Sequence, residues 1–410
     1  MRRKRPEANS ARVAWLIVVG LFAFMVAFSA GCGDDDDDDG GGGEAISEIG
    51  EPEGELNLIA WIGYTEDGST DPDVDWVTPF EEETGCKVNV KYGVTSDEMV
   101  QLMRTGQYDG VSASGDATAR LVEGGDVDPV NTDLVPNYAD VVDALKDTDY
   151  NTFDGTNYGV PHGRGTNLLM FNTEEVTPAP TSWDVVFDPE VASKYAGKVT
   201  AYDNPIYIAD AALYLREHQP DLGIEDPYEL DQEQFDAALE LLKQQREIIG
   251  EYWNDATKQV SAFENGDTVV GTTWPYQTGL LQFSGEPVEA ILPDEGATGW
   301  SDTWMLSSEA EHPNCMYLWM DHVLDPEVQA QIAVWYGEAP ANPKACALTG
   351  DLPKVYGGTP EQCEITHAED EEFFDQIEYW ETPVSDCGDD RGDVCKTYDD
   401  WVQGWTEVKG

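Results

Sequence analysis

The sequence has few basic residues for its length. Lysine and arginine number 22 among 410 residues, against 82 aspartates and glutamates, which gives a formal net charge of −60. Outside the N-terminal Arg-Arg-Lys-Arg run, the basic residues form no cluster. Binding of nucleic acid requires such clusters to neutralise phosphates, so the sequence disfavours nucleic acid as a partner. The acidity fits a cationic ligand or solubility in concentrated salt, and a generally acidic surface is the simpler explanation for most of these carboxylates.

Common catalytic and metal-binding patterns are also missing. The five histidines are scattered and form no H-E-x-x-H motif or recognisable triad. None of the seven cysteines belongs to a C-x-x-C pair, which argues against zinc and thioredoxin-like redox chemistry. The segment from Ser112 to Asp116 nearly resembles a G-x-S-x-G nucleophile turn, but Ser114 occupies the place of the second Gly and no His–Asp partnership is evident. We therefore expect no enzyme activity, no metal and no cofactor, with an exported hydrolase as the weakest alternative.

The N-terminus has the pattern of an export signal. Four basic residues precede an uncharged apolar run over 13–29, which leads through Ala-Gly to Cys32. This ending resembles the lipobox of bacterial lipoproteins, which implies a signal peptide over 1–31 and lipidation of Cys32, although Ser29 stands where that pattern usually has Leu. An uncleaved membrane anchor is the alternative, because the run is close to the minimum spanning length. Both interpretations place the rest of the chain outside the cytoplasm.

Residues 32–54 have the composition of a tether. Six consecutive aspartates at 34–39 and four glycines at 40–43 cannot bury a core and should form an extended, solvated segment. A calcium site is the sharper alternative, but consecutive aspartates lack the alternating ligand spacing of an EF-hand loop.

Six cysteines remain once Cys32 is set aside. Disulfides are the expected state outside the cell, and six cysteines allow about 15 pairings. Proximity in the sequence favours two of the pairs, and elimination leaves the third. The alternative for this third pair is two buried free thiols. The pairs are Cys346–Cys363, Cys387–Cys395 and, by elimination, Cys86–Cys315.

Beyond residue 55 the hydrophobic pattern alternates between strands and helices. Strands are predicted near 56–61, 87–92 and 108–111, with a helix over 77–84 and a second helix that Ser96 caps, so the fold class is α/β. A long amphipathic helix is predicted over 232–249 and another helix near 371–380. In open α/β sheets the loop after a strand commonly binds ligands, and the loop from 112 to 116 follows the third strand.

Trp300 and Asp302 form the most specific pair in the sequence. They lie in an extended stretch, where residues i and i+2 point the same way and are about 7 Å apart. An indole face and a carboxylate on one side suit a cationic ligand with an apolar stem. The alternative is a core tryptophan beside a solvated aspartate.

The order of motifs resembles bacterial ABC-transporter substrate-binding lipoproteins of the spermidine/putrescine-binding type, which have the periplasmic-binding-protein type II fold. The similarity covers essentially all of the chain from residue 55. In chain order, the motifs are Trp61 with Tyr64, Phe80 to Val88, Gly106 to Asp109, Tyr158 to Pro161, Phe263 to Trp274, Pro293 to Gly296, Trp300 to Asp302 and Ala339 to Asn342.

The resemblance implies two α/β lobes joined by two crossing strands, with a ligand cleft between the lobes. Residues 55–161 and 298–340 would form lobe 1, and residues 165–296 and 345–410 would form lobe 2, whose last part is stapled by disulfides. The implied partners are a small solute, the permease subunits of an ABC transporter and, through the lipid anchor, the membrane. The protein is expected to be a monomer at the outer face of the cytoplasmic membrane.

The resemblance also implies which residues line the cleft, and five of them depart from the family pattern. Asp116 replaces an aromatic residue, Glu338 a tyrosine and Glu381 a glutamine. Asn204 and Tyr207 replace the two carboxylates of the second lobe. Carried over residue by residue, the cleft positions are Trp61, Tyr64, Ser114, Asp116, Asn204, Tyr207, Trp274, Trp300, Asp302, Glu338 and Glu381.

These features predict the solute-binding component of an importer for a polyamine-like cationic amine such as spermidine or putrescine. A different small solute is the alternative: a sugar, an amino acid derivative, thiamine or a metal complex. Arg164 bears on this choice, because in the cleft it would repel an ammonium and favour a ligand with a carboxylate. A salt bridge within this acidic protein is the more economical role for Arg164.

Overall fold

The computed structural model describes residues 43, 45–352 and 361–410. The predicted signal peptide, Cys32 and almost all of the predicted tether lie outside the described residues. The contacts separate residues 1–40 from a second unit, 41–410, which contains every element discussed below. Within the described residues, no helix has both the length and the apolar character needed to cross a membrane.

A first mixed sheet is built mainly from the N-terminal third of the chain. Its strand order is β2-β1-β3-β15-β4, with β7 also paired to β15. β1, β2 and β3 are parallel, whereas β15 returns antiparallel beside β3. The strands are β1 (Glu55–Trp61), β2 (Lys87–Gly93), β3 (Gly110–Ala113), β4 (Val127–Asp128), β7 (Gly159–Pro161) and β15 (Thr303–Ser307).

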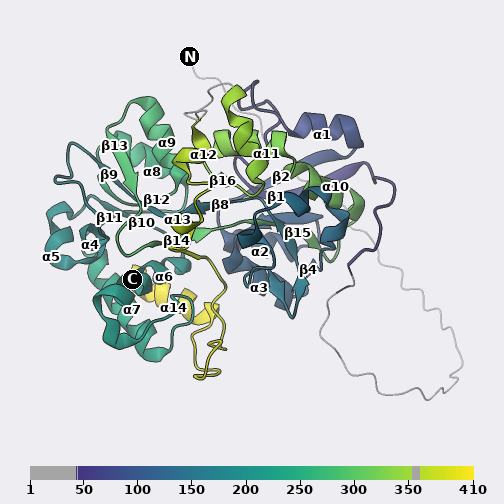
Figure 1. Cartoon of the computed structure of the whole chain (residues 1–410). Helices are drawn as coiled ribbons and strands as arrows, with labels where there is room; N and C mark the ends of the chain where they lie inside the picture. The colour runs from purple at the N-terminus through teal and green to yellow at the C-terminus, as the bar shows by residue number, and fades with distance from the viewer. Residues whose placement is uncertain (1–42, 44, 353–360) are drawn as a thin grey trace, which may run out of the picture. The chain divides into compact units, whose positions relative to one another are not determined.

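Helices surround this sheet. In Figure 1, α1, α2, α3 and α10 lie around β1, β2 and β15. They are α1 (Val77–Thr84), α2 (Ser96–Met103), α3 (Gly115–Glu123), α10 (Pro313–Val323) and α11 (Pro326–Tyr336). α1 ends as predicted at Gly85, whose left-handed φ of 75° suits glycine. The predicted cap of α2 is wrong by one residue: the Thr95 side chain accepts from the Glu98 amide, and Ser96 is instead the first helical residue.

A second sheet has the order β11-β10-β12-β9-β13. Its strands are β9 (Leu168–Asn172), β10 (Val199–Tyr202), β11 (Ile249–Trp253), β12 (Val270–Thr273) and β13 (Val288–Ile291). The helices of this part of the chain are α4 (Asp184–Phe187), α5 (Pro189–Ala192), α6 (Ile208–His218), α7 (Gln232–Arg246), α8 (Ala256–Glu264), α9 (Pro275–Ser284) and α14 (Tyr398–Lys409). The predicted amphipathic helix is α7, which begins at a capping box between Asp231 and Gln234 because each side chain bonds the other's backbone amide.

The segments that connect the two sheets form a small sheet of their own. Its order is β16-β8-β14-β17, and we call it the hinge sheet. β8 and β14 contain the two crossings predicted from the sequence, β16 adds a third, and β17 pairs alongside β14. The strands are β8 (Gly163–Thr166), β14 (Ala297–Trp300), β16 (Ala339–Pro340) and β17 (Ile377–Tyr379). The predicted helix near 371–380 is therefore wrong beyond its first turn: α13 covers Glu371–Phe374, and the chain then pairs as β17.

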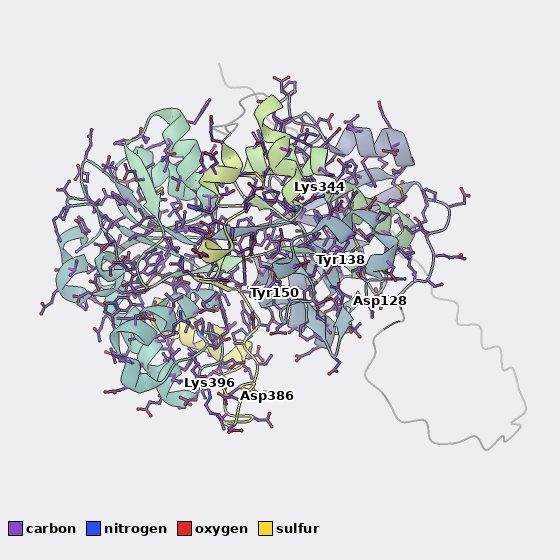
Figure 2. All side chains as sticks on the ribbon, viewed as in Figure 1. Asp128, Tyr138, Tyr150, Lys344, Asp386 and Lys396 are labelled. Atoms are coloured by element: carbon purple, nitrogen blue, oxygen red, sulfur yellow. A yellow bond between two sulfur atoms is a disulfide. The ribbon has the colours of Figure 1, made fainter. Side chains whose placement is uncertain are left out.

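All three expected disulfides are present: Cys86–Cys315, Cys346–Cys363 and Cys387–Cys395. The first joins the end of α1 to α10 across a separation of 229 residues. The third closes a short loop near the lower edge of Figure 2, where Asp386 and Lys396 mark its two ends.

Candidate functional site

One small cavity is lined by residues from both large sheets and from the hinge sheet. About 210 Å³ of empty space lies between its walls, part of it continuous with solvent. Most of its residues lie at the C-terminal ends of strands or within three residues beyond them, the usual place for ligand sites in open α/β sheets. The lining residues are Trp61, Tyr64, Ser114, Trp274, Trp300, Asp302, Tyr336 and Trp380. We call this the aromatic cavity.

Asp302 is the only carboxylate among the described residues that line the aromatic cavity. It lies between β14 and β15 and is only 3% exposed. The Tyr64 hydroxyl donates to Oδ2 at 2.7 Å, and the Ser114 hydroxyl donates to Oδ1. Burial raises the pKa of Asp302 to about 6, although both hydrogen bonds act to lower it. In the part of the chain that the structure describes, no lysine or arginine forms an ion pair with Asp302, so the carboxylate has hydrogen-bond donors but no counter-ion.

Aromatic rings form the rest of the wall. Trp61 meets Trp274 edge-on, with ring centroids 6.5 Å apart, so the first and second sheets contribute facing indoles. Trp300 meets Tyr336 edge-on at 5.9 Å. Trp380 stacks on Tyr202 at 5.7 Å and 8° between planes, which fixes its orientation. The wall is therefore rigid, apolar and rich in π faces, as sites for organic cations are.

A close backbone approach positions Trp300. A Cβ atom on Gly165 would lie 2.1 Å from Cζ2 of the Trp300 ring. Gly165 pairs with Trp300 between β8 and β14 of the hinge sheet. Only glycine lets the crossing strand pass this close to the indole. The hinge strand therefore supports one wall of the cavity directly.

Glu338 lies next to the aromatic cavity but does not line it. It is fully buried, and its Oε1 is 3.5 Å from Nε2 of His162. Trp304 donates its indole N–H to Nδ1 of His162 at 3.0 Å, so a neutral His162 carries its hydrogen on Nε2, toward Glu338. Burial and the nearby Asp302 carboxylate raise the pKa of Glu338, and burial lowers the pKa of His162 to about 3. Both shifts favour the uncharged forms of the pair.

A second, larger cavity of about 950 Å³ lies against the hinge sheet and is separate from the aromatic cavity except for the shared Tyr336. Both Glu338 and Arg164 line it. Arg164 is 1% exposed, pairs with Glu371 at 2.8 Å and places its guanidinium 3.5 Å from the ring centre of Phe374. The salt bridge is therefore the role that the structure gives Arg164.

Other predicted site residues lie outside both cavities. Asp116 accepts from the Ser96 hydroxyl at 2.8 Å, and burial raises its pKa to about 7. Asn204 accepts from the Ile206 amide and so begins a short 3₁₀ turn.

Tyr207 and Glu381 are also absent from the lining. The Tyr207 hydroxyl accepts from Gln245, and its ring packs against Phe187 and Trp405 in the core beside the second sheet. Burial, with nearby acidic groups led by Asp226, raises the pKa of Glu381 to about 8. The aromatic cavity therefore brings together six of the eleven predicted residues: Trp61, Tyr64, Ser114, Trp274, Trp300 and Asp302.

Tyr336 and Trp380 were missed by sequence reasoning. Trp380 is the neighbour of the predicted Glu381, and adjacent residues of an extended segment point to opposite sides. Placing a helix where β17 lies removed the alternation that would have identified Trp380. Tyr336 is the last residue of α11, before Gly337, and a helical pattern gives no sign that its ring faces a ligand site.

One group of potential metal ligands occurs among the described residues, made of Asp184, His218 and Glu295. His218 already contacts Glu295 at 2.9 Å, and Glu295 also accepts from the hydroxyl of Ser182 and the amide of Trp183. The Tyr214 hydroxyl donates to Asp184. The group therefore forms a satisfied network that fixes the start of α4.

Comparison with known proteins places the chain in a family. Residues 75–354 match the family of bacterial extracellular solute-binding proteins. The chain belongs to this family. The fold is accordingly a two-lobed solute-binding fold, and the family is one of solute-binding proteins rather than enzymes. Its description also places its members outside the cytoplasm.

Individual relatives are distant but cover most of the chain. A putrescine/cadaverine-binding protein of Pseudomonas aeruginosa is 23% identical over 321 residues, which span 73% of this chain and 82% of the relative. Spermidine/putrescine-binding periplasmic protein 1 of Haemophilus influenzae is 22% identical over 386 residues, 93% of this chain and 96% of the relative.

Solved structures share the fold with different ligands. A putative spermidine/putrescine ABC transporter protein from Listeria monocytogenes is 18% identical, with a TM-score of 0.69 over 87% of this chain and 99% of that one. The binding protein MotA from A. tumefaciens B6, in complex with glucopine, is 17% identical, with a TM-score of 0.64 over 87% and 100%. At these identities the likeness establishes the fold, and the ligand must be argued from the cavity.

Proposed function

We propose that this protein is the extracytoplasmic receptor of an ABC importer and that it captures a cationic amine, in the class that includes the polyamines putrescine and spermidine. The observation that carries the proposal is the buried Asp302 carboxylate, which has no counter-ion among the described residues and is enclosed by aromatic rings. A buried carboxylate without a counter-ion is costly, and a bound ammonium would supply the missing charge. The names of the curated relatives support the same class of ligand.

Binding would be coupled to closure about the hinge sheet. Trp61 is the last residue of β1 in the first sheet, and Trp274 follows β12 of the second. Rotation of one sheet relative to the other would therefore open or close the cavity. Closure removes the ligand from water, where the attraction between the ammonium, Asp302 and the π faces is stronger. A permease that recognises the closed form would then receive only loaded receptor.

The proposal includes lipid anchoring through Cys32 and a monomeric receptor. The sequence pattern at the N-terminus supports the anchor. Metabolic labelling with a fatty acid tests it: wild type should incorporate label and Cys32→Ser should not. Labelling of both forms, or of neither, would contradict the proposed lipid anchor and would leave the proposed ligand class unaffected. Light scattering of the purified protein checks the monomer.

Calorimetric titration of the purified full chain with putrescine, spermidine, a sugar panel and amino acids tests the ligand class. We expect binding of at least one cationic amine and its loss in Asp302→Asn, which keeps the side-chain shape but removes the charge. Asp143→Asn is the matched control, because the Asp143 side chain is fully exposed and the change alters net charge equally. Binding of a sugar or an acidic ligand, with no response to any cationic amine, would overturn the proposal.

A further inference from the structure

Among the described residues, the aromatic cavity has one charged group that can accept hydrogen bonds, Asp302. Its tryptophan side chains are donors only. The Tyr64 and Ser114 hydroxyls both point their hydrogens at Asp302, whose two oxygens each already accept one bond. A primary ammonium brings three N–H donors, and a linear diamine brings six. The remaining lone pairs of Asp302 and the hydroxyl oxygens of Tyr64 and Ser114 can accept from one ammonium group. Within the described chain, however, no second carboxylate lines the cavity to balance the charge at the other end of a diamine.

A singly charged, alkylated ammonium avoids this deficit, because it needs only one carboxylate. It carries its charge on methyl groups, which need no hydrogen-bond acceptor and contact the faces of aromatic rings favourably. Six of the eight lining residues are aromatic, so π faces rather than acceptors are what the cavity offers in abundance. Recognition of quaternary ammonium by such cages is an established use of cation–π attraction.

The cavity is also small. In this structure its walls leave room for about one water, so any ligand enters only as the walls move apart. Trp253 and Tyr202 pack directly against Trp274, at 4.9 and 5.5 Å between ring centroids, so this wall cannot retreat easily to admit a longer chain.

Unpaired indole N–H donors in the cavity wall favour a ligand that carries a hydrogen-bond acceptor. The indole N–H groups of Trp61, Trp300 and Trp380 are buried and have no acceptor among the described residues. A buried donor without a partner is unfavourable, so a ligand oxygen near one of them would stabilise the complex. No lysine, arginine or histidine of the described ranges lines the cavity, so a ligand carboxylate would find no counter-ion there and would face Asp302. A neutral hydroxyl meets the requirement better.

We infer that the ligand of the aromatic cavity is a compact, singly charged, N-alkylated ammonium compound with a hydroxyl group, the chemistry of choline, rather than a linear diamine. This inference rests on the proposed function, since it narrows the cationic amine of that proposal to one chemical class. Asp302 balances the charge, the aromatic rings surround the alkyl groups, and the ligand oxygen accepts from the indole donors.

Three ligand pairs test the inference on the unmodified full chain by calorimetric titration. Choline and ethanolamine share a hydroxyethyl group and differ only in the three N-methyl groups. Choline should bind at least about tenfold more tightly, given the strength of a desolvated cation–π contact. Choline should also bind more tightly than putrescine, which brings a second charge, and than glycine betaine, which replaces the hydroxyl by a carboxylate.

The outcomes separate the inference from the proposal beneath it. Equal or tighter binding of ethanolamine, putrescine or spermidine would overturn the alkylated-ammonium inference while the cationic-amine receptor stands. Tighter binding of glycine betaine than of choline would contradict the inference that the ligand carries a hydroxyl group. Failure of all these amines to bind would overturn both.

A variant pair gives an independent readout. Trp274→Leu removes a π face but keeps apolar bulk, and it should weaken choline binding by about tenfold. Ile62→Leu is the control: the residue is 63% exposed beside Trp61 and does not line the cavity, so its affinity should equal that of wild type. Unchanged affinity in a folded Trp274→Leu protein would overturn the role of the cage. If that variant does not fold, the ligand pairs on the wild type decide the question.

Discussion

The hydroxyl of Tyr64 lies 2.7 Å from Oδ2 of Asp302, although 238 residues separate them in the sequence. Tyr64 follows β1, and Asp302 precedes β15, which pairs with β3 in the same sheet. With Ser114 on the other oxygen, the carboxylate is held from both sides before any ligand arrives. Such preorganisation removes an ordering cost from binding.

Tyr64→Phe should therefore weaken binding of the cationic ligand. The change removes one donor from Asp302 and leaves the ring, which stacks on His162 at 3.9 Å, in place. The bond is present with and without ligand, so only its part in keeping Asp302 ionised and oriented is lost, and the affinity should fall by up to about tenfold. Calorimetric titration measures the effect. Tyr92→Phe is the control, because it removes a hydroxyl that bonds Thr65 outside the cavity. An affinity equal to wild type in Tyr64→Phe would contradict the role given to this bond.

Ligand affinity should depend on pH through Asp302. Burial raises the pKa of Asp302 to about 6, and the ionised form binds a cation. The affinity for a permanently charged quaternary ammonium should be nearly constant above that pKa. It should fall by about tenfold for each pH unit well below it, because a proton must leave before the ligand binds.

Titration calorimetry at about pH 5 and about pH 8, in buffers of different ionisation enthalpy, would show this as proton release at the lower pH. Asp302→Asn should abolish both the binding of the ligand and the release of a proton that accompanies it. Constant affinity across this range would mean that Asp302 does not carry the charge that attracts the ligand.

The sequence predicted features that depend on neighbouring residues better than features that depend on contacts between distant segments. Strand and helix periodicity identified the β1–α1–β2–α2–β3 series, because each element shows its own hydrophobic face. The disulfides followed from proximity, and the last pair from elimination. The cap of α2 was misplaced by one residue because Thr95 and Ser96 are both good N-cap residues.

The site was predictable only where a residue sits at a strand end that the resemblance could align. Trp61 and Trp274 are such residues. Tyr207 illustrates the failure: it occupies an aligned position, but its ring turns into the core against Phe187 and its hydroxyl bonds Gln245. No pattern within one segment shows which way such a side chain points, because the packing partners come from α4 and α7.

Stability without ligand should decrease as pH rises through the acidic range, and Asp210 offers a direct test. Burial raises its pKa to about 7 from a usual value of 3.8, and Thr298 donates to it at 3.1 Å. In the folded protein Asp210 keeps its proton up to that pKa, whereas the unfolded chain loses it near 4. The unfolded state therefore binds fewer protons between these values, so the free energy of unfolding falls as pH rises. The loss is about 4 kcal/mol for a shift of this size.

Asp210→Asn should remove this loss. Relative to wild type, it should be stabilising by a few kcal/mol at about pH 8 and nearly neutral at about pH 4. Urea unfolding at both pH values measures the difference, with the exposed Asp143→Asn as the control. A variant that is equally destabilised at both pH values would show that the hydrogen bond with Thr298, rather than the proton, sets the contribution of Asp210.

The long-range disulfide should contribute more to stability than the short one. Cys86–Cys315 closes a loop with a separation of 229 residues, against 8 for Cys387–Cys395. Loop-closure entropy in the unfolded chain predicts a contribution of about 5 kcal/mol for the first and about 2–3 kcal/mol for the second, before other effects of the bonds are counted. Replacing each pair by serines and measuring unfolding in urea tests the order. Both pairs are buried, with Cys86 and Cys315 at 0% and Cys387 and Cys395 at 0% and 5%, so the packing cost of the serines is similar in the two variants. An equal or larger loss on removal of Cys387–Cys395 would mean that local native contacts near α14, rather than the entropy of the unfolded chain, determine what these disulfides contribute.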